Sequence, residues 1–569
     1  MANGCNRNPI GICSKAEGIN TISNGTASHA EGSGTIAGGD ASHTEGFQTE
    51  TTAGAAHAEG SNTSATGLVS HAEGFLTTAS GGSSHAEGSN TSATGLVSHA
   101  EGFLTTASGG TSHAEGSNSV AEGAASHAEG YFTRASANTA HAEGSSSLAS
   151  GYASHAEGSN TRALNLHAHA EGNLTTASGI ASHAEGENTV ASGLVSHAEG
   201  QGTRAQGESS HAEGDQTAAN GRASHAEGNL TLASGIFAHA EGQRTTAAGD
   251  LSHAEGNQTQ ALGQNSHAEG ALNIASGFTS HAEGVNTVAS GFFSHTEGQS
   301  TNANLLEGVH VMGQFGAANE LPYSWYLANG INDSTPSLAA KILSNGNVKI
   351  DGTVTTPAAD YAEMFETTDG YPIEFGYFVT LEKDKVRIAT GQDDYILGIS
   401  SARPAFLADS GELRWKNKYL TTEWGEILYE NISLPSILDA TGNVVVPKRT
   451  ELRPVLNPDW NAALEYQPRS SRPEWIAIGL LGKLLIRDDG SCEVNGYCMP
   501  NGEGIATKAK QGYRVLDRTG TNQILVLFNS VPVNSSNHIE DLKKLAELKE
   551  QGHLSEEEFR IEKQKLLNS

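Results

Sequence analysis

A fourteen-residue pattern of small, polar and charged positions runs through the first half of the chain. Histidine recurs at every fourteenth position from His29 to His295, twenty times in register, and Glu follows two positions after each histidine. One further copy, Ser14–Gly18, lies one period upstream with Lys15 in place of histidine. A fixed period of this kind predicts an array of stacked units, here 21 of them.

Each unit repeats its own pattern at half the period, because residues 70–76 and 77–83 both read Ser/Thr-x-Ala-x-Gly-x-x. Coiled coils also have a seven-residue period, but their recurrent positions hold Leu or Ile, and a glycine at every seventh position would cost a helix about 1 kcal/mol each time. The pattern instead predicts a short extended segment and then a turn on glycine, where φ > 0 is tolerated, twice per coil of a β-solenoid.

Strand parity assigns the two faces of each extended segment. Residues two apart share a face, so Ser and Ala lie on one side and His and Glu on the other. Ser, Thr and Ala recur in both halves of the unit and are predicted to fill a narrow interior, which turns His and Glu outward. Coils stacked about 4.8 Å apart would give a rod about 100 Å long with ladders of His over His and Glu over Glu.

Composition and charge narrow the possible functions. The chain has 68 glycines in 569 residues, only 6% aromatic residues and a net charge of −31. Such a chain cannot build one large apolar core, and a polyanion is not a nucleic-acid binder by bulk electrostatics. Residues 1–7 lack the apolar segment of a signal peptide, and no stretch approaches about 20 apolar residues. We therefore expect synthesis in the cytoplasm without membrane insertion.

The repeat resembles the head domain of trimeric autotransporter adhesins over residues 14–308. The resemblance implies a left-handed parallel β-roll of about 21 coils that forms trimers. In that family the two outward positions equivalent to His71 and Glu73 are usually aliphatic and face the three-fold axis. This chain departs from the family by placing a charged pair there, so a hydrogen-bonded His/Glu seam would replace the apolar interface.

Three interpretations of the His/Glu face are open: a seam between subunits, a solvated face, or a metal-binding array. The uniformity of this face, against the variable outward positions of the second half, favours the seam. No metal site and no cofactor are predicted. In a seam, the pKa of each histidine should be raised and that of each glutamate lowered, so rod stability should peak at mildly acidic pH. The expected ladder is represented by His29, His71, His127, His183, His239, His295, Glu31, Glu73, Glu129, Glu185, Glu241 and Glu297.

The strict periodicity ends near Gly298, and the following segment is richer in aromatic residues. Residues 340–350 contain Asn345-Gly346 between two apolar runs, which predicts a β-hairpin. We interpret residues 309–356 as a small β connector that caps the open end of the roll, and residues 1–13 as an N-terminal tail or cap.

Residues 357–534 have the composition of a conventional domain and short apolar runs at 377–381, 395–399, 476–486 and 523–528, which predict strands. From Asp360 onward the chain resembles peptidase G2, the autoproteolytic intramolecular-chaperone domain of tailed-phage appendages and tail spikes. The resemblance rests on motifs at 360–366, 412–415 with 418–420, 472–475 and 487–492.

The last segment, residues 535–569, shows helical spacing of Ile539, Leu542, Leu545 and Leu548, and then a capping box that begins at Ser555. It resembles the short helical hairpin known as SHOCT, for which we expect an oligomerisation or docking role. Overall, the predicted fold is mainly β, with a trimeric solenoid rod, a β-rich chaperone domain and a terminal α-hairpin.

The resemblance to peptidase G2 implies self-cleavage just upstream of Asp360. Peptide hydrolysis needs an activated water and a protonated leaving amine, which two carboxyl groups in different environments can supply. Asp360 and Glu363 are the candidate catalytic pair. We place the scissile bond near residue 356, within the segment Val354, Thr355, Thr356, Pro357, Ala358, Ala359 and Asp360.

These inferences predict a trimeric fibre or spike of a virion or prophage-derived particle whose C-terminal domain directs assembly and then cuts itself. Its partners would be two further copies of the chain and a host-surface receptor or glycan. The alternative is a bacterial surface adhesin or spacer with an uncleaved trimerisation domain. A polysaccharide-degrading enzyme is disfavoured, because the Glu residues of the rod share one environment and nothing separates an acid from a base.

Overall fold

The computed structural model describes residues 6–411, 417–438, 442, 444–529 and 538–568. The chain divides into two compact units, Met1–Gly352 and Thr353–Ser569. The motif at 412–415, which contributed to the resemblance to peptidase G2, lies outside the described residues, as do residues 535–537 of the expected hairpin.

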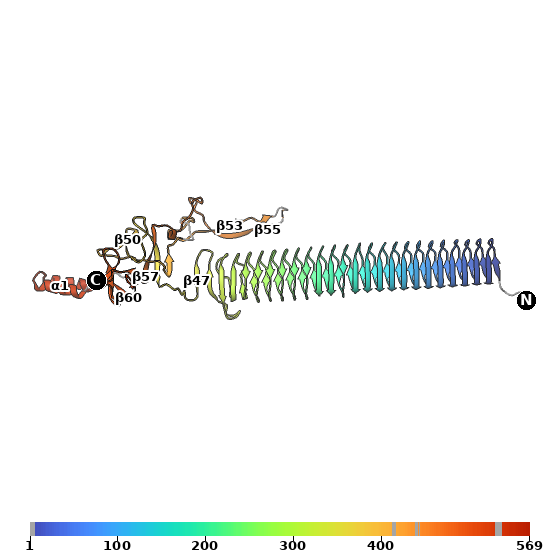
Figure 1. Ribbon diagram of the computed structural model, residues 1–569, viewed down its shortest axis with the longest axis horizontal. Coiled ribbons are helices and arrows are strands. Elements are labelled where there is room, and N and C mark those ends of the chain that lie inside the picture. The colour runs from blue at the N-terminus through green and yellow to red at the C-terminus, as the bar shows by residue number, and fades with distance from the viewer. Residues whose placement is uncertain (1–5, 412–416, 439–441, 443, 530–537, 569) are drawn as a thin grey trace. The chain divides into compact units, whose positions relative to one another are not determined.

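The first unit is a parallel β-solenoid (Figure 1). Most coils hold a five-residue strand that begins at the ladder histidine, such as β10 (His71–Phe75), and a two-residue strand, such as β11 (Thr78–Ala79). Each strand pairs in parallel with its equivalents one coil away, so His71 lies between His57 and His85. Several later coils shorten the first strand to two residues, as in β26 (His183–Ala184). The predicted solenoid is confirmed.

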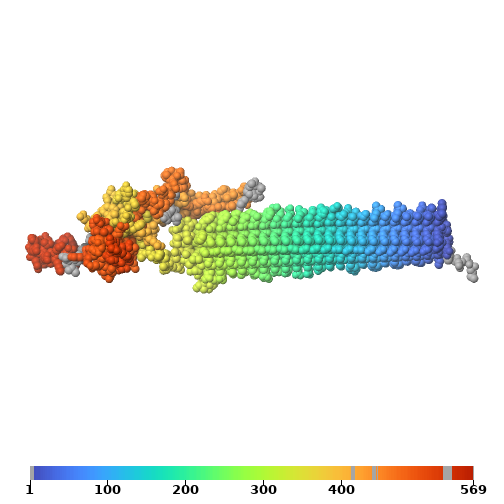
Figure 2. Space-filling view, in the orientation of Figure 1, coloured from blue at the N-terminus to red at the C-terminus, as the bar shows by residue number. Residues whose placement is uncertain are grey.

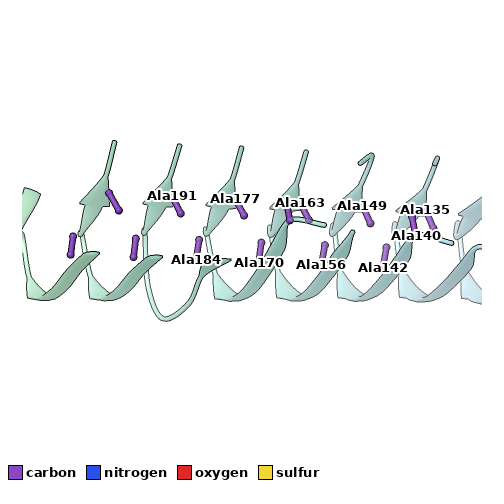
Figure 3. Close-up of a cluster of buried hydrophobic side chains, with 14 of the residues drawn as sticks. Ala135, Ala140, Ala142, Ala149, Ala156, Ala163, Ala170, Ala177, Ala184 and Ala191 are labelled. Carbon is purple, nitrogen blue, oxygen red and sulfur yellow. The ribbon is translucent and has the colours of Figure 1, made fainter. Parts of the chain in front are cut away.

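Small side chains fill the interior as predicted. The alanines of both halves are fully buried and stack along the rod (Figure 3). In most coils a buried serine precedes the ladder histidine, and its hydroxyl donates to a glycine carbonyl three residues earlier, as from Ser84 Oγ to Gly81 O at 2.7 Å. The outward side chains form continuous rows along the surface (Figure 2). Strand parity therefore assigned the two faces correctly.

The prediction of two positive-φ glycine turns per coil is half wrong. Gly74, in the first half of its unit, has φ 111°, but Gly81, in the second half, has no positive φ. Gly81 is required for another reason: a Cβ there would lie 1.8 Å from the carbonyl oxygen of Gly95 in the next coil. The left-handed conformation falls instead on ordinary residues two positions after each glycine, Leu76 (φ 55°) and Ser83 (φ 54°).

The solenoid has about 23 coils, two more than the fourteen-residue pattern predicts. β42 (His295–Thr296) pairs in parallel with β44 (His310–Ala317), and β44 pairs in parallel with β45 (Trp325–Asn329). The period lengthens to fifteen residues here, which hides the last coils from a strict fourteen-residue count. Near the other end, β1 (Arg7–Pro9) already pairs with β3 (Thr21–Ser23).

An antiparallel hairpin ends this sheet. β46 (Leu338–Ile342) pairs with β45, and β47 (Val348–Ile350) pairs with β46 across the predicted Asn-Gly turn. A local core of Val309, Val311, Tyr326 and Leu343 lies under it. These larger side chains replace the alanines of the regular coils and close the end of the rod's interior.

The second unit contains a mixed sheet around a conventional core that includes Phe378, Ile399, Ile486 and Phe528. Strands form at or near all four expected runs, although residues 395–397 of the second run precede the strand at Gly398–Ser400. The strands of this sheet are β48 (Asp360–Glu366), β49 (Phe378–Glu382), β50 (Lys385–Ile388), β51 (Gly398–Ser400), β52 (Phe406–Ala408), β57 (Trp475–Arg487), β58 (Tyr497–Pro500), β59 (Ala506–Ala509), β60 (Tyr513–Gly520) and β61 (Gln523–Phe528).

Two separate two-stranded sheets pair β53 (Tyr429–Leu434) with β56 (Arg449–Pro454) and β54 (Ile437–Leu438) with β55 (Val444–Val446). The chain then ends in α1 (His538–Glu550) and α2 (Glu556–Asn568). The predicted capping box is present, because the Ser555 N–H donates to Glu558 Oε2 at 2.9 Å. Within the described residues, neither helix is both long and apolar enough to cross a bilayer.

Candidate functional site

The peptide bond before Asp360 lies where an exposed segment enters the second unit. Val354 is solvent-exposed, and no strand or helix covers residues 351–359. The first residue of β48, Asp360, is only 5% exposed. A linker that is accessible up to Ala359 and then passes into a buried strand presents one peptide bond at the boundary between solvent and core.

Buried polar contacts fix the Asp360 carboxylate. The Ser401 hydroxyl donates to Asp360 Oδ2 at 2.7 Å, and the Ser401 N–H is held by the Ala477 carbonyl at 2.9 Å. The backbone of Asp360 is fixed as well, since its carbonyl accepts the Ala405 N–H at 2.9 Å. A buried carboxylate with a hydrogen-bond donor is oriented and kept from free rotation.

The carbonyl of Ala359, the residue before Asp360, is also fixed. It accepts the Lys483 N–H at 3.3 Å. Gly482, in the middle of the apolar strand β57, has φ 121°, and a Cβ there would lie 2.1 Å from the Ala359 oxygen. A glycine is therefore needed for the two backbones to approach so closely. A backbone N–H aimed at a carbonyl oxygen is the kind of donor that stabilises the oxyanion formed during acyl transfer.

Within one chain, Glu363, the second predicted catalytic residue, does not lie on the same face of β48 as Asp360. Asp360 and Ala362 are buried, whereas Tyr361 and Glu363 lie on the more exposed face of β48. The Tyr361 hydroxyl donates to Glu363 Oε1 at 2.7 Å, and this bond raises the pKa of the phenol. The structure thus places the two carboxylates on opposite faces of one strand.

A cleft of about 870 Å³ adjoins the junction. Its lining includes Ala359, Asp360, Ser401, Arg403 and Lys483. Water can therefore reach the peptide bond before Asp360. Ser401 and Lys483 were not predicted as site residues, because they lie far from Asp360 along the chain. Gly482 was detectable, since an isolated glycine inside an apolar strand signals a bulge or a close backbone approach.

The His/Glu face of the rod is a continuous double ladder. Each neighbouring pair of imidazoles from His29 to His310 is stacked with ring centroids 4.5–4.9 Å apart. His71 Nε2 lies 3.6 Å from Glu73 of its own coil, whereas His295 Nε2 lies 3.4 Å from Glu283 of the preceding coil. These histidines are about a third exposed; the His85 side chain, for example, is 36% exposed.

In the single chain, the pKa of several ladder histidines is lowered, which is opposite to the direction expected for a seam between subunits. Burial, and then the neighbouring imidazoles, lower the pKa of His57, His99 and His127, and that of His295 falls to about 4. The neighbouring glutamates raise the histidine pKa, but their effect is smaller. Burial and the stacked imidazoles therefore lower the histidine pKa by more than the paired glutamates raise it.

The glutamates alternate along the rod. Between Glu115 and Glu283, hydrogen bonds between carboxyl groups raise the pKa of every second one to about 7, as at Glu115 and Glu143, and lower the pKa of those between, as at Glu129 and Glu157. Adjacent carboxylates repel one another at close range, so the members with a raised pKa hold their proton to a higher pH than those between them.

Exposed apolar residues border the ladder in several coils. Around His71 they are Leu68, Val69, Phe75 and Leu76, which are 44–63% exposed. The same arrangement recurs around His99 with Leu96, Val97, Phe103 and Leu104. A half-exposed polar face with apolar borders resembles an interface more than a fully solvated surface.

Comparison with known proteins gives matches in both units. The family described as Peptidase_G2, IMC autoproteolytic cleavage domain, matches residues 317–523. The YadA head domain repeat matches residues 100–126, 170–194 and 240–266. The chain therefore carries both the head-type repeats and the G2 domain that the sequence analysis expected.

Relatives occur in phages and a phage-related locus. The chain is 34% identical over 185 residues to the pre-neck appendage protein of Bacillus phage B103, covering 32% of this chain and 20% of that protein. It is 36% identical over 165 residues to the pre-neck appendage protein of Bacillus phage phi29, covering 29% and 18%. The putative phage-related protein YobO of Bacillus subtilis (strain 168) is 33% identical over 170 residues, covering 29% and 20%. The chain thus spans about a fifth of the length of these relatives.

Two solved structures are also similar. One is the C-terminal fragment of bacteriophage phi29 gene product 12, at 32% identity and a TM-score of 0.25, covering 30% of this chain and 100% of that one. The other is the pre-mature bacteriophage phi29 gene product 12, at 15% identity and a TM-score of 0.41, covering 91% and 76%.

Proposed function

For a chain that joins YadA-head-type repeats to a peptidase G2 domain and is similar to phage pre-neck appendage proteins, we propose the role of a trimeric appendage fibre of a virion or prophage-derived particle. The second unit directs assembly as an intramolecular chaperone and then cuts itself from the rod. The single observation that carries this proposal is the peptide bond between Ala359 and Asp360, which is exposed on one side and fixed on the other.

The cleavage step is hydrolysis of that bond. Water adds to the Ala359 carbonyl carbon, and the Lys483 N–H stabilises the oxygen as it gains negative charge. The bond from this carbon to the Asp360 nitrogen then breaks. One carboxyl group takes a proton from the water while the other gives a proton to the leaving amine. The products are an Ala359 carboxylate and a new N-terminal Asp360.

Assembly supplies the second carboxyl group. Asp360 faces the buried side of β48 and belongs to its own junction, whereas Glu363 is displayed on the other face. We assign Glu363 to the junction of a neighbouring copy. Cleavage then requires the trimer, so the chaperone is released only after it has acted.

The ladder supports the trimer. The His/Glu face is uniform over twenty coils, about a third exposed and bordered by apolar residues, whereas the outward positions of the second half vary from coil to coil. A surface that packs against copies of itself must stay uniform along its length. A host-surface receptor or glycan is the partner class that we expect for such an appendage, and binding to purified host cell wall tests it.

Mixed trimers test the shared site. Asp360→Asn and Glu363→Gln chains should each stay uncut alone, because each homotrimer lacks one carboxylate at every junction. Coexpression should restore cleavage of Glu363→Gln chains only, because these keep Asp360 and receive Glu363 from a neighbour. Asp384→Asn, an exposed aspartate of the same unit, is the control and should be cut like the native chain. Cleavage of either variant alone, or none in the mixture, contradicts the shared site.

A further inference from the structure

The ladder brings metal-ligating atoms together at regular intervals. Two histidines of adjacent coils and the glutamate of one of them, such as His57, Glu59 and His71, place one ligand atom each within 4.8 Å of one another. The same arrangement is found at His71, Glu73 and His85, at His85, Glu87 and His99, at His99, Glu101 and His113, and at His127, Glu129 and His141.

The imidazole nitrogens in these groups are not committed elsewhere. Nε2 of His57, His71, His85 and His99 is shielded from solvent and has no hydrogen-bond partner among the described residues. Each lies 3.6–3.7 Å from a carboxylate oxygen of its own coil, which is beyond hydrogen-bond length. A buried nitrogen without a partner is costly, and a metal ion between nitrogen and carboxylate would satisfy both.

From this geometry we propose that the His/Glu face binds divalent transition-metal ions, each held by Nε2 of two stacked histidines and one glutamate oxygen. Two imidazoles and a carboxylate suit Zn²⁺, Cu²⁺ or Ni²⁺, whereas Mg²⁺ and Ca²⁺ prefer all-oxygen sites. Zn–N bonds of about 2.0–2.1 Å require the three ligand atoms to approach by about 1 Å. Rotation of the half-buried imidazoles about their side-chain bonds provides this movement, and a water completes a tetrahedron.

Each ion would tie two successive coils together through side chains. This adds a cross-link along the rod axis that the backbone ladder does not supply. The proposal goes beyond the appendage function and does not depend on it, because all three ligands of a site come from one chain. Since each histidine can serve one ion at a time, the 21 stacked histidines from His29 to His310 hold about ten ions per chain.

Metal analysis of the full-length chain, without an affinity tag, tests this proposal. After equilibration with excess Zn²⁺ and removal of free metal, we expect about ten Zn²⁺ per chain and no retained Mg²⁺ in a parallel sample. Replacing four adjacent ladder residues, His99→Gln, His113→Gln, His127→Gln and His141→Gln, leaves pairs for about eight ions. The matched control changes the outward residues of the second half of the same coils, Thr106→Gln, Val120→Gln, Arg134→Gln and Leu148→Gln, and should keep about ten.

Fewer than two Zn²⁺ per native chain would overturn the proposal, as would an unchanged ratio in the His→Gln variant or equal retention of Mg²⁺. Far-UV circular dichroism of all variants ensures that a lower ratio is not caused by a lost solenoid. Trimer formation and cleavage are measured on the same samples without Zn²⁺, so failure to bind metal leaves the appendage proposal standing.

Discussion

The rod and the C-terminal sheet are both β-structures, but they differ in how far apart their paired strands lie along the chain and in the size of their buried side chains. In the regular coils of the rod, each strand pairs with the equivalent strand fourteen residues away, and the interior holds almost entirely alanine, serine, threonine and glycine. In the C-terminal sheet, β48 pairs with β57 more than a hundred residues later, around large side chains such as Phe378 and Phe528. The rod is thus stabilised by many small, identical contacts, whereas the sheet is stabilised by a few contacts between large side chains.

This contrast also separates the roles of the two units. A rod of local contacts can grow coil by coil, and its stability is close to a sum over neighbouring coils. A sheet of distant pairings forms as one unit, and it can hold a buried carboxylate and a fixed peptide bond in one geometry. We therefore expect a destabilising substitution to affect only neighbouring coils in the rod, but to destabilise the C-terminal unit as a whole.

Removing one large core side chain should give the largest effect. Phe378→Ala deletes a fully buried ring whose centroid lies 5.3 Å from that of Tyr513. We expect a loss of about 3–5 kcal/mol in the C-terminal unit. Denaturant unfolding, followed by tryptophan fluorescence, measures it; four of the five tryptophans lie in this unit. Tyr371→Ala, at an exposed position, is the control and should change stability little. Equal losses in both variants would contradict a conventional core.

Overfilling one coil of the rod should cost less and act locally. Ala142 is fully buried between the equivalent alanines of its neighbours, so Ala142→Leu forces the interior apart, at about 1–3 kcal/mol. Hydrogen exchange should show faster amide exchange in the few coils around residue 142 and unchanged protection in the C-terminal sheet. The outward substitution Leu148→Ala is the control. Loss of protection along the whole rod would show that its coils are not independent.

A substitution at a left-handed turn position should raise the stability of the rod, whereas the two preceding substitutions lower stability. Val97 has φ 58°, which is strained for a β-branched residue, while Asn90 in the same coil has the same φ with a residue that tolerates it. Val97→Asn should raise rod stability by about 1 kcal/mol, and Asn90→Val should lower it by a similar amount. Thermal unfolding of the two variants measures both. Equal melting temperatures would mean that these turns carry no strain.

The ladder should produce the smallest effect, a dependence on pH. The folded-state pKa of His127, His141, His169 and His183 lies below the unfolded value of about 6.5. The stability linked to these groups is present above pH 6.5 and is lost as pH falls through the folded-state pKa. Replacing all four by Gln should reduce the drop in melting temperature between pH 8 and pH 5. Solvent screening keeps the difference small.

The glutamates should contribute a pH dependence of stability in the opposite direction. The pKa of Glu115, Glu143, Glu171 and Glu199 is raised to about 7, so their contribution is present below pH 4.5 and is lost as pH rises through 7. Replacing these four by Gln should flatten the melting temperature between pH 6 and pH 8. Identical pH profiles for the native chain and both variants would contradict the ladder electrostatics.

Much of the rod could be predicted from the sequence, because side chains alternate between the interior and the surface with a period of two residues along each strand. The faces of each strand, the buried Ser and Ala and the Asn345-Gly346 hairpin follow from local spacing. The two last coils could not be predicted, because the period lengthens to fifteen residues and Trp325 takes the place of histidine. The lowered histidine pKa of the single chain was also not predicted, since it depends on burial and on the imidazoles stacked in neighbouring coils.

The candidate site was less predictable, because it depends on distant pairings. The sequence motif at 360–366 placed Asp360 and Glu363 together, whereas the strand separates them onto opposite faces. Ser401 reaches Asp360 from 41 residues away, and Lys483 reaches Ala359 from the far strand β57. No short-range pattern encodes these contacts.

Mass spectrometry of the purified full-length chain, denatured after a prolonged incubation as an assembled fibre, tests the central claim most directly. Cleavage before Asp360 predicts two products, residues 1–359 and 360–569, the second with Asp360 as its N-terminus. The Asp360→Asn variant should give only the intact mass. A native chain that stays a single 59.0 kDa species in the assembled state would contradict self-cleavage. The second unit would then be an assembly domain that remains attached to the rod.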